Sequence, residues 1–132
     1  MNAKELMIDD WVAIRDDRDP LYYEDGQINQ LADYGNTIVV NGTELLAELI
    51  EPIAIDAQIL DANGFRYTNL DNYCKIVTND VYPNPFYIEY NTANKSLFIN
   101  EGLVPTPVLY VHQLQHVFRL CGIADFYLTP NN

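Results

Sequence analysis

The chain has 132 residues and a formal net charge of −12, from 19 acidic and seven basic side chains. Because 48% of the residues are apolar and ten are tyrosines, the composition excludes an intrinsically disordered chain. The length suffices for one medium domain or two very small ones, and no apolar run approaches the ~20 residues that span a membrane. The first residues lack the apolar core of a signal peptide, so we predict a cytoplasmic protein.

The negative charge is concentrated in the first half of the chain. Residues 1–66 hold fourteen acids and four bases, a net charge of −10, whereas residues 67–132 hold five and three, a net charge of −2. Such a balance repels phosphate backbones, so we expect no direct binding of nucleic acid. Two interpretations remain. The acidic side chains keep the protein soluble, or they form a surface that binds a basic protein, in the extreme case by imitating DNA.

The first 55 residues alternate between short β-prone segments and turn residues. We predict strands at Trp11–Arg15, Leu21–Glu24, Gln27–Leu31 and Thr37–Val40, and within Leu45–Glu51, which is either one strand or a helical turn and a strand. The turns are Asp9-Asp10, Asp25-Gly26, Tyr34-Gly35-Asn36 and Asn41-Gly42, of which Asp25-Gly26 is the strongest hairpin signal. Five strands in about fifty residues predict a small Src-homology-3-like β-barrel over residues 1–55. Its aromatic residues would be core or would line a peptide groove; these are Trp11, Tyr22, Tyr23 and Tyr34.

A loop dense in charge separates the first two predicted strands. Asp16 and Asp17 lie in it, but the spacing, central glycine and closing glutamate of a calcium-binding EF-hand are absent. We therefore interpret the loop as a solvated turn. Together with Tyr22 and Tyr23, it forms an acidic-aromatic edge that is one of two candidate binding surfaces.

Residues 56–132 predict a helix, an antiparallel sheet and a second helix. Asp56 is a good N-cap for a short helix over Ala57–Ala62, which Asn63-Gly64 would end. The predicted strands are Phe65–Thr68, Tyr73–Val77, Phe86–Asn91 and Ser96–Asn100, the last two joined as a hairpin across residues 92–95, with an edge strand within Ile123–Leu128. In the hairpin, Phe86, Ile88 and Tyr90 share one face of the sheet and Tyr87 and Glu89 the other. We therefore predict an α+β fold with two subdomains, or with one continuous core.

The longest helix is predicted at about residues 107–121, with Thr106 as N-cap, Pro107 in the first turn and Gly122 after the last turn. At 100° per residue, one apolar stripe faces the core: Tyr110, Val111, Leu114, Val117, Phe118 and Cys121. The second candidate binding surface is the polar side, namely His112, Gln115, His116 and Arg119. Leu109 and Leu120 lie nearly opposite the stripe and suggest a second contact, with another element or with a partner.

His112 and His116 have the i, i+4 spacing with which two imidazoles share a zinc ion. Gln113, however, occupies the place of the glutamate base of zinc proteases, and Arg119 would repel a cation. We therefore interpret this face as solvated and predict no metal and no cofactor. Cys74 and Cys121 are the only cysteines, are predicted to be buried thiols, and have no CxxC or cysteine–histidine arrangement. Nucleotide-binding and serine-hydrolase motifs are absent from the sequence.

Three stretches resemble a family of small uncharacterised proteins from intestinal Bacteroides-type bacteria, their phages and their mobile elements. These stretches are ELMIDDWV, LIEPIAI with ILDANGF, and YVHQLQHVFRLCGI, which together span most of the chain. Similar segments of the family read roughly ELxIGDWV, EPIPLT…L…NGF and YVHQLQ…L, with the strongest match in the helix. Asp9 here replaces a glycine and Ala54 a proline. Because the family has no assigned function, the resemblance implies origin and architecture, slightly favours an action on host or phage proteins, and carries over no catalytic residues.

These observations favour a non-enzymatic protein-interaction or regulatory module, such as an accessory protein of a mobile element. The expected partner is a protein, basic if the acidic surface binds it, and neither nucleic acid nor membrane. One alternative is an acidic decoy, a DNA mimic that occupies a DNA-binding protein. A further alternative is a small metal-dependent enzyme that uses His112 and His116. The unpaired edge of the C-terminal sheet leaves a homodimer open.

Overall fold

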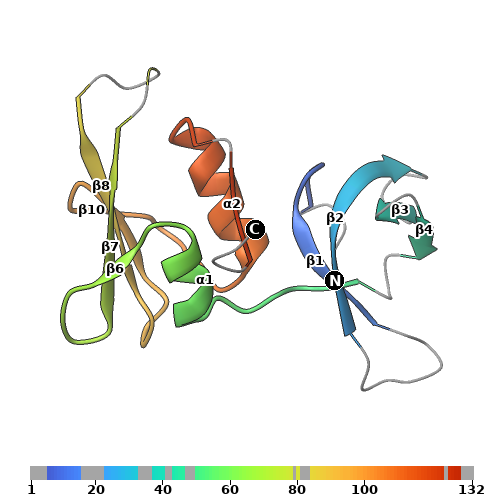
Figure 1. The fold of residues 1–132 in the computed structure, drawn as a ribbon, viewed down its shortest axis with the longest axis horizontal. Helices are drawn as coiled ribbons and strands as arrows, with labels where there is room; N and C mark the ends of the chain where they lie inside the picture. Colours follow the sequence, from blue (N-terminus) through green and yellow to red (C-terminus); the bar gives the residue numbers. More distant parts are fainter. Residues whose placement is uncertain are drawn as a thin grey trace. The chain divides into compact units, whose positions relative to one another are not determined.

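The computed structural model describes residues 6–15, 23–32, 37–40, 43–46, 50–78, 80, 84–123 and 125–128. These residues form an α+β fold that contains two antiparallel sheets and two helices (Figure 1). The chain divides into two compact units, Met1–Ala54 with Tyr110–His112, and Ile55–Leu109 with Gln113–Asn132. Among the described residues, neither helix has the length and apolar character needed to cross a membrane.

The N-terminal unit is built on a curled, half-barrel sheet. Its strands are β1 (Trp11–Arg15), β2 (Tyr23–Ala32), β3 (Thr37–Val40), β4 (Thr43–Leu46) and β5 (Ile50–Glu51), in the order β4-β3-β2-β1-β5. The predictions of β1 and β3 are confirmed. The segment predicted within Leu45–Glu51 is divided between β4, which pairs with β3, and β5, which pairs with β1. The predicted turns Tyr34-Gly35-Asn36 and Asn41-Gly42 contain only residues outside the described part.

The hairpin predicted at Asp25-Gly26 is wrong. Both residues lie inside the ten-residue strand β2, where Asp25 pairs with Ala13 and Gly26 with Val12 of β1. An Asp-Gly turn forms when the flanking segments pair with each other. Here the segments on both sides of Gly26 pair with β1 instead, so a long-range ladder overrides the local turn preference.

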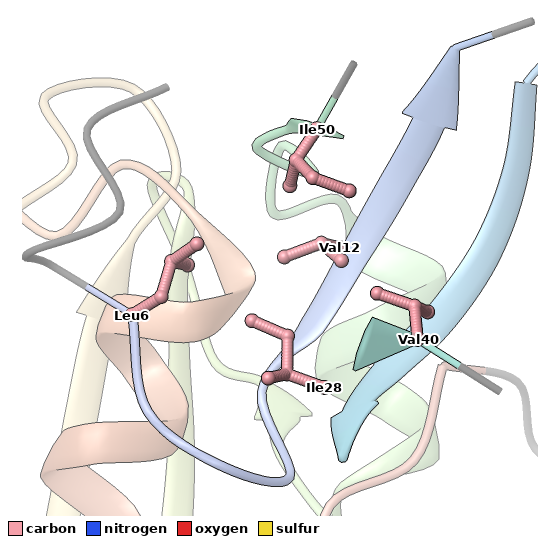
Figure 2. Close-up of a cluster of buried hydrophobic side chains, with 5 residues drawn as sticks. All are labelled: Leu6, Val12, Ile28, Val40 and Ile50. Carbon is pink, nitrogen blue, oxygen red and sulfur yellow. The ribbon is translucent and has the colours of Figure 1, made fainter. Parts of the chain in front are cut away.

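The core of the N-terminal unit is a cluster of five aliphatic side chains that point toward one another (Figure 2). They come from the lead-in before β1 and from four of the strands: Leu6, Val12, Ile28, Val40 and Ile50. The lead-in is held by a turn at Ile8 and Asp9, in which the buried Asp10 accepts a hydrogen bond from the Met7 N–H at its Oδ2 (2.7 Å). Asp9 has φ +73°, a left-handed conformation that glycine adopts without strain.

The C-terminal unit contains the second sheet. Its strands are β6 (Arg66–Tyr67), β7 (Asn72–Val77), β8 (Phe86–Asn91), β9 (Leu97–Ile99) and β10 (Gly102–Leu103), in the order β10-β9-β8-β7-β6. The predicted hairpin across residues 92–95 is confirmed, since β8 and β9 pair on either side of it. The short strand β10 was not predicted. Asn100 (φ 48°) and Glu101 (φ 70°) form the two-residue turn before it, and positive φ at both positions suits the right-handed twist of a hairpin.

The short helix α1 (Ala57–Ala62) has the predicted bounds, and the predicted cap is confirmed because Asp56 Oδ1 accepts a hydrogen bond from the Ile59 N–H (2.8 Å). The helix α2 (Val111–Leu120) is followed by Gly122, the glycine predicted after its last turn. Gly122 has φ +77°, its N–H donates to the Arg119 carbonyl (3.1 Å), and the Ile123 N–H donates to the Phe118 carbonyl (2.9 Å). This pair of bonds is the Schellman arrangement, which satisfies the last carbonyls of a helix.

The predicted start of the second helix is wrong, because α2 begins at Val111 and not at Pro107. The preceding residues are bonded to the hairpin: the Val104 N–H donates to the Leu97 carbonyl (2.9 Å) and the Val108 N–H to the Lys95 carbonyl (2.9 Å). Proline also disfavours helical backbone in the residue before it, which affects residues 104 and 106. The Gln113 side chain accepts from the Leu109 N–H (2.7 Å) and so helps to cap the shortened helix.

The edge strand predicted within Ile123–Leu128 is also wrong, since residues 125–128 belong to neither sheet. They are held instead by a side chain, that of Asn63, which bonds the backbone of Tyr127. A terminal segment needs no ladder when a side chain supplies both hydrogen-bond partners.

Tyr90 connects the C-terminal sheet to the segment that leads into α2. Its ring is fully buried, and its hydroxyl donates to the Val108 carbonyl at 2.6 Å. Burial raises the pKa of this phenol to about 12, because the charged phenolate would lose its hydration.

We expect Tyr90→Phe to lower the free energy of unfolding by about 1–3 kcal/mol at pH 9, because the buried Val108 carbonyl loses its donor. The pKa of about 12 in the folded state exceeds the ordinary value of 10, so stability is complete below pH 10 and falls as pH rises toward 12. The variant lacks this loss. Urea denaturation should therefore show the gap between wild type and variant narrowing by about 1 kcal/mol between pH 9 and pH 11. An unchanged difference in the free energy of unfolding between pH 9 and pH 11 would contradict the burial of the Tyr90 hydroxyl.

Candidate functional site

The four polar residues predicted on the long helix lie in α2, but they do not form a solvated face. His112 is 1% exposed and Gln115 is 4% exposed, whereas His116 and Arg119 are half-buried. The interpretation of a solvated face is therefore wrong for His112 and Gln115. A helical wheel assigns faces within one helix and carries no information on what covers its first turn.

The start of α2 shows why His112 is covered. Tyr110 forms an antiparallel bridge with Ala54, and the Val111 N–H donates to the Ile53 carbonyl (2.8 Å). The ring of His112 is stacked on that of Tyr110, with centroids 6.0 Å apart and planes 11° apart. His112 thus belongs, with Tyr110 and Val111, to the N-terminal unit, although most of α2 belongs to the C-terminal unit.

The second predicted surface, the acidic-aromatic edge, falls mostly outside the described residues. Asp16, Asp17 and Tyr22 are not among them, and of Tyr23 the structure describes the backbone as the first residue of β2. This surface stays a prediction. Within the described ranges, no three His, Cys, Asp or Glu side chains gather closely enough to hold a metal ion.

A third candidate surface, which was not predicted from the sequence, is the side of the C-terminal sheet opposite its helices. The two helices lie on one side of this sheet (Figure 1), and Phe118 of α2 contacts Phe65 and the Lys75 amine there. On the other side, strand pairing places side chains from all five strands. We call this set the outer face: Arg66, Cys74, Ile76, Tyr87, Glu89, Phe98 and Leu103.

Register determines how the outer face is arranged. One row crosses the sheet through successive pairs, Arg66 with Cys74, Cys74 with Glu89, Glu89 with Phe98 and Phe98 with Leu103. In the adjacent row Ile76 pairs with Tyr87. Ile76 is 74% exposed and Leu103 is also exposed, although both are large aliphatic side chains.

Carboxylates border the apolar part of the outer face. Burial and the hydrogen-bonded Glu101 carboxylate, with a further contribution from Glu89, raise the pKa of Tyr87. Burial and Glu89 likewise raise the pKa of the Cys74 thiol. The Tyr87 phenol and the Cys74 thiol therefore remain protonated at neutral pH. A nearby cation would be attracted to the carboxylates of Glu89 and Glu101.

A cleft of about 480 Å³ opens near the end of the same sheet. It is lined by residues that flank β8 and β9 and by the end of α2: Asn84, Pro85, Phe86, Ile99, Asn100, Leu120 and Cys121. Asn100 connects the cleft to the outer face, because its Oδ1 accepts a hydrogen bond from the Tyr87 N–H (3.0 Å). Burial raises the pKa of Cys121, so this thiol is a weak nucleophile. The lining suits contact with an apolar group rather than covalent chemistry.

Sequence reasoning assigned Tyr87 and Glu89 correctly to the face opposite Ile88 and Tyr90, which the burial pattern confirms. It missed Ile76 and Leu103. Alternation along β7 could have shown that Ile76 shares a face with Cys74, whereas Leu103 depended on the unpredicted strand β10.

Comparisons with known proteins add no family to these observations. No protein-family model, no curated protein and no solved structure matches this chain.

Proposed function

We propose that this chain is a non-enzymatic protein-interaction module whose docking surface is the outer face of the C-terminal sheet. The observation that carries the proposal is the exposure of Ile76 and Leu103 on that face, where Leu103 pairs with Phe98 and Ile76 with Tyr87. Large exposed apolar side chains gathered on one sheet face are typical of protein contacts, because a partner removes them from water.

The expected partner combines apolar and basic side chains. Glu89 and Glu101 lie beside the apolar residues, and the whole chain has a net charge of −12. A basic surface would approach such a chain faster and in a preferred orientation, while the apolar contacts would supply most of the affinity. The raised pKa values of Cys74 and Cys121, which keep both as thiols, support a role without nucleophilic catalysis.

Three broader features belong to the same proposal. The curled N-terminal sheet of five antiparallel strands supports a Src-homology-3-like barrel, to which a helix–sheet–helix unit is joined. The three sequence stretches support a relation to small proteins of Bacteroides-type mobile elements, and the composition supports a cytoplasmic location. An accessory or regulatory role in such an element accords with a protein that docks and does not catalyse.

The proposal is tested by affinity capture from lysate at low and at moderate salt, with wild type, Ile76→Glu and Leu120→Glu as baits. The two substituted leucine and isoleucine side chains are equally exposed, at 78% and 74%, but Leu120 lies on α2 and not on the outer face. We expect Ile76→Glu to lose at least about tenfold of a stoichiometric partner, because a charge is placed in an apolar contact, and Leu120→Glu to retain it.

Other outcomes would contradict the outer face. If Ile76→Glu retains the partner and Leu120→Glu loses it, the partner binds at the cleft, which Leu120 lines. A basic partner that is lost at moderate salt and displaced by duplex DNA would favour the acidic decoy instead. Circular dichroism of each bait controls for folding.

A further inference from the structure

The side chain of Asn63 bonds the backbone of the C-terminal segment Asp125–Leu128. The Asn63 Oδ1 accepts a hydrogen bond from the Tyr127 N–H (2.8 Å), and the Asn63 Nδ2 donates to the Tyr127 carbonyl (2.6 Å). One carboxamide therefore satisfies both backbone groups of one residue, as a neighbouring strand residue would in an antiparallel ladder. The N–H and C=O of a residue point to the same side in extended backbone, so Asn63 reads main chain and not side chain.

Asn63 is fixed in position by the end of α1. It is the C-cap residue, and Gly64 follows it with φ +84°. The Asn63 Nδ2 also donates to the Ile59 carbonyl (2.8 Å), and the Asn63 carbonyl accepts from the Lys75 Nζ (2.7 Å). A Cβ atom at Gly64 would lie 2.9 Å from that Nζ, so glycine leaves the room that the lysine needs. The Ile59 carbonyl thus holds the carboxamide, and the Lys75 amine holds the backbone carbonyl of the same residue.

Apolar contacts on either side of Tyr127 complete the grip on the segment. Phe126 packs edge-on against Phe118 of α2, with ring centroids 5.3 Å apart and planes at 61°. Leu128 is only 7% exposed, whereas Asp125 is exposed and Tyr127 half-buried. Phe126, like Tyr127, is half-buried, and its apolar contact with Phe118 and the burial of Leu128 lie on either side of Tyr127.

We propose that Asn63 and the adjoining apolar surface at Phe118 form a binding groove for an extended peptide, and that this chain's own segment Asp125–Leu128 occupies the groove. The groove favours an aromatic residue at the position of Phe126, which meets Phe118, and an apolar residue at the position of Leu128, which is buried. This inference goes beyond the proposed function and does not rest on it, since it uses neither Ile76 nor any other residue of the outer face.

Competition determines when another peptide can enter. The segment follows Ile123, which the Schellman bonds attach to the end of α2, so its effective concentration at the groove is on the order of millimolar or higher. A free peptide with the same pattern therefore has to exceed about a millimolar to displace it. If the hydrogen bonds of the segment to Asn63 were weakened, a free peptide would displace the segment at a lower peptide concentration.

The test uses the full chain and a fluorescent peptide with the sequence of residues 123–129. Tyr127→Pro in the chain removes the N–H that Asn63 accepts, whereas Tyr127→Phe keeps it and is the matched control. By fluorescence anisotropy we expect the peptide to bind Tyr127→Pro at least about tenfold more tightly than wild type or Tyr127→Phe. The same peptide with an N-methyl group on the residue equivalent to Tyr127 should lose at least about tenfold in affinity.

A second measurement decides the case if Tyr127→Pro fails to fold. In the wild-type chain, about 5 mM peptide should accelerate hydrogen exchange at the amides of Phe126 to Leu128, and the N-methylated peptide should not. Equal affinities of the two peptides, or a folded Tyr127→Pro variant that binds no more tightly than wild type, would overturn the groove. Unchanged exchange at that peptide concentration would overturn it as well.

Discussion

Phe118→Ala is expected to lower the free energy of unfolding of the C-terminal unit by about 3–5 kcal/mol, the range for removing a buried phenylalanine. Phe118 is fully buried, its ring stacks on Phe65 with centroids 6.0 Å apart, and Phe126 meets it edge-on. The Lys75 Nζ lies 5.8 Å from the ring centroid. Aromatic pairs add about 0.5–1.5 kcal/mol each to the burial term, so the upper part of the range is expected.

The matched control for this prediction is Leu120→Ala, two residues later in the same helix. Leu120 is 78% exposed, and alanine favours helix, so the change should stay within about 0.5 kcal/mol. Urea unfolding is followed by circular dichroism at the helical band, which reports mainly on α1 and α2. The helix α1 and eight residues of α2 belong to the C-terminal unit. Equal effects of the two substitutions would contradict the burial of Phe118.

Ile28→Ala is expected to destabilise the N-terminal unit by about 2–5 kcal/mol. Ile28 is fully buried in the five-residue cluster of Figure 2, and its backbone is bonded to the lead-in turn, where its N–H donates to the Asp10 carbonyl (3.0 Å). Removing three methyl or methylene groups leaves a cavity beside Val12 that the sheet can close only partly. The loss therefore combines transfer free energy with a cavity term.

Trp11, the only tryptophan of the chain, lies in β1 and provides the probe for this unit. The urea midpoint from Trp11 fluorescence should fall for Ile28→Ala and stay nearly constant for Ile8→Ala, because Ile8 is exposed in the lead-in turn. A shift of the fluorescence midpoint that is as large for Ile8→Ala would contradict the assignment of the core.

Much of the fold follows from local signals in the sequence. The helix Ala57–Ala62 was predicted with its bounds, because Asp56 bonds the Ile59 N–H and Gly64 takes the left-handed conformation after the helix. Gly122 ends α2 for the same reason. β1, β3 and β8 were predicted from runs of β-prone or alternating residues, and these determine their state through neighbours only a few residues away.

The candidate site was less predictable, because its residues are brought together by pairing between distant strands. Ile76 and Leu103 are two separate apolar residues in sequence, and both join the outer face through the register of the C-terminal sheet. His112 and Gln115 were predicted to be solvated from their polarity, yet both are buried. Polarity within one helix does not determine burial when another segment covers the helix.

The sequence by itself thus determined both ends of α1, the glycine after α2 and the alternation of the hairpin, because caps and pleats act over two to five residues. Tertiary structure alone decided that Asp25-Gly26 continues a strand, that α2 starts late and that Asn63 holds Tyr127. In each of these cases a hydrogen-bond partner many residues away replaces the local one. A long-range backbone hydrogen bond, together with the burial around it, stabilises the fold by more than local conformational preferences do. Those preferences differ between residue types by only a few tenths to about one kcal/mol.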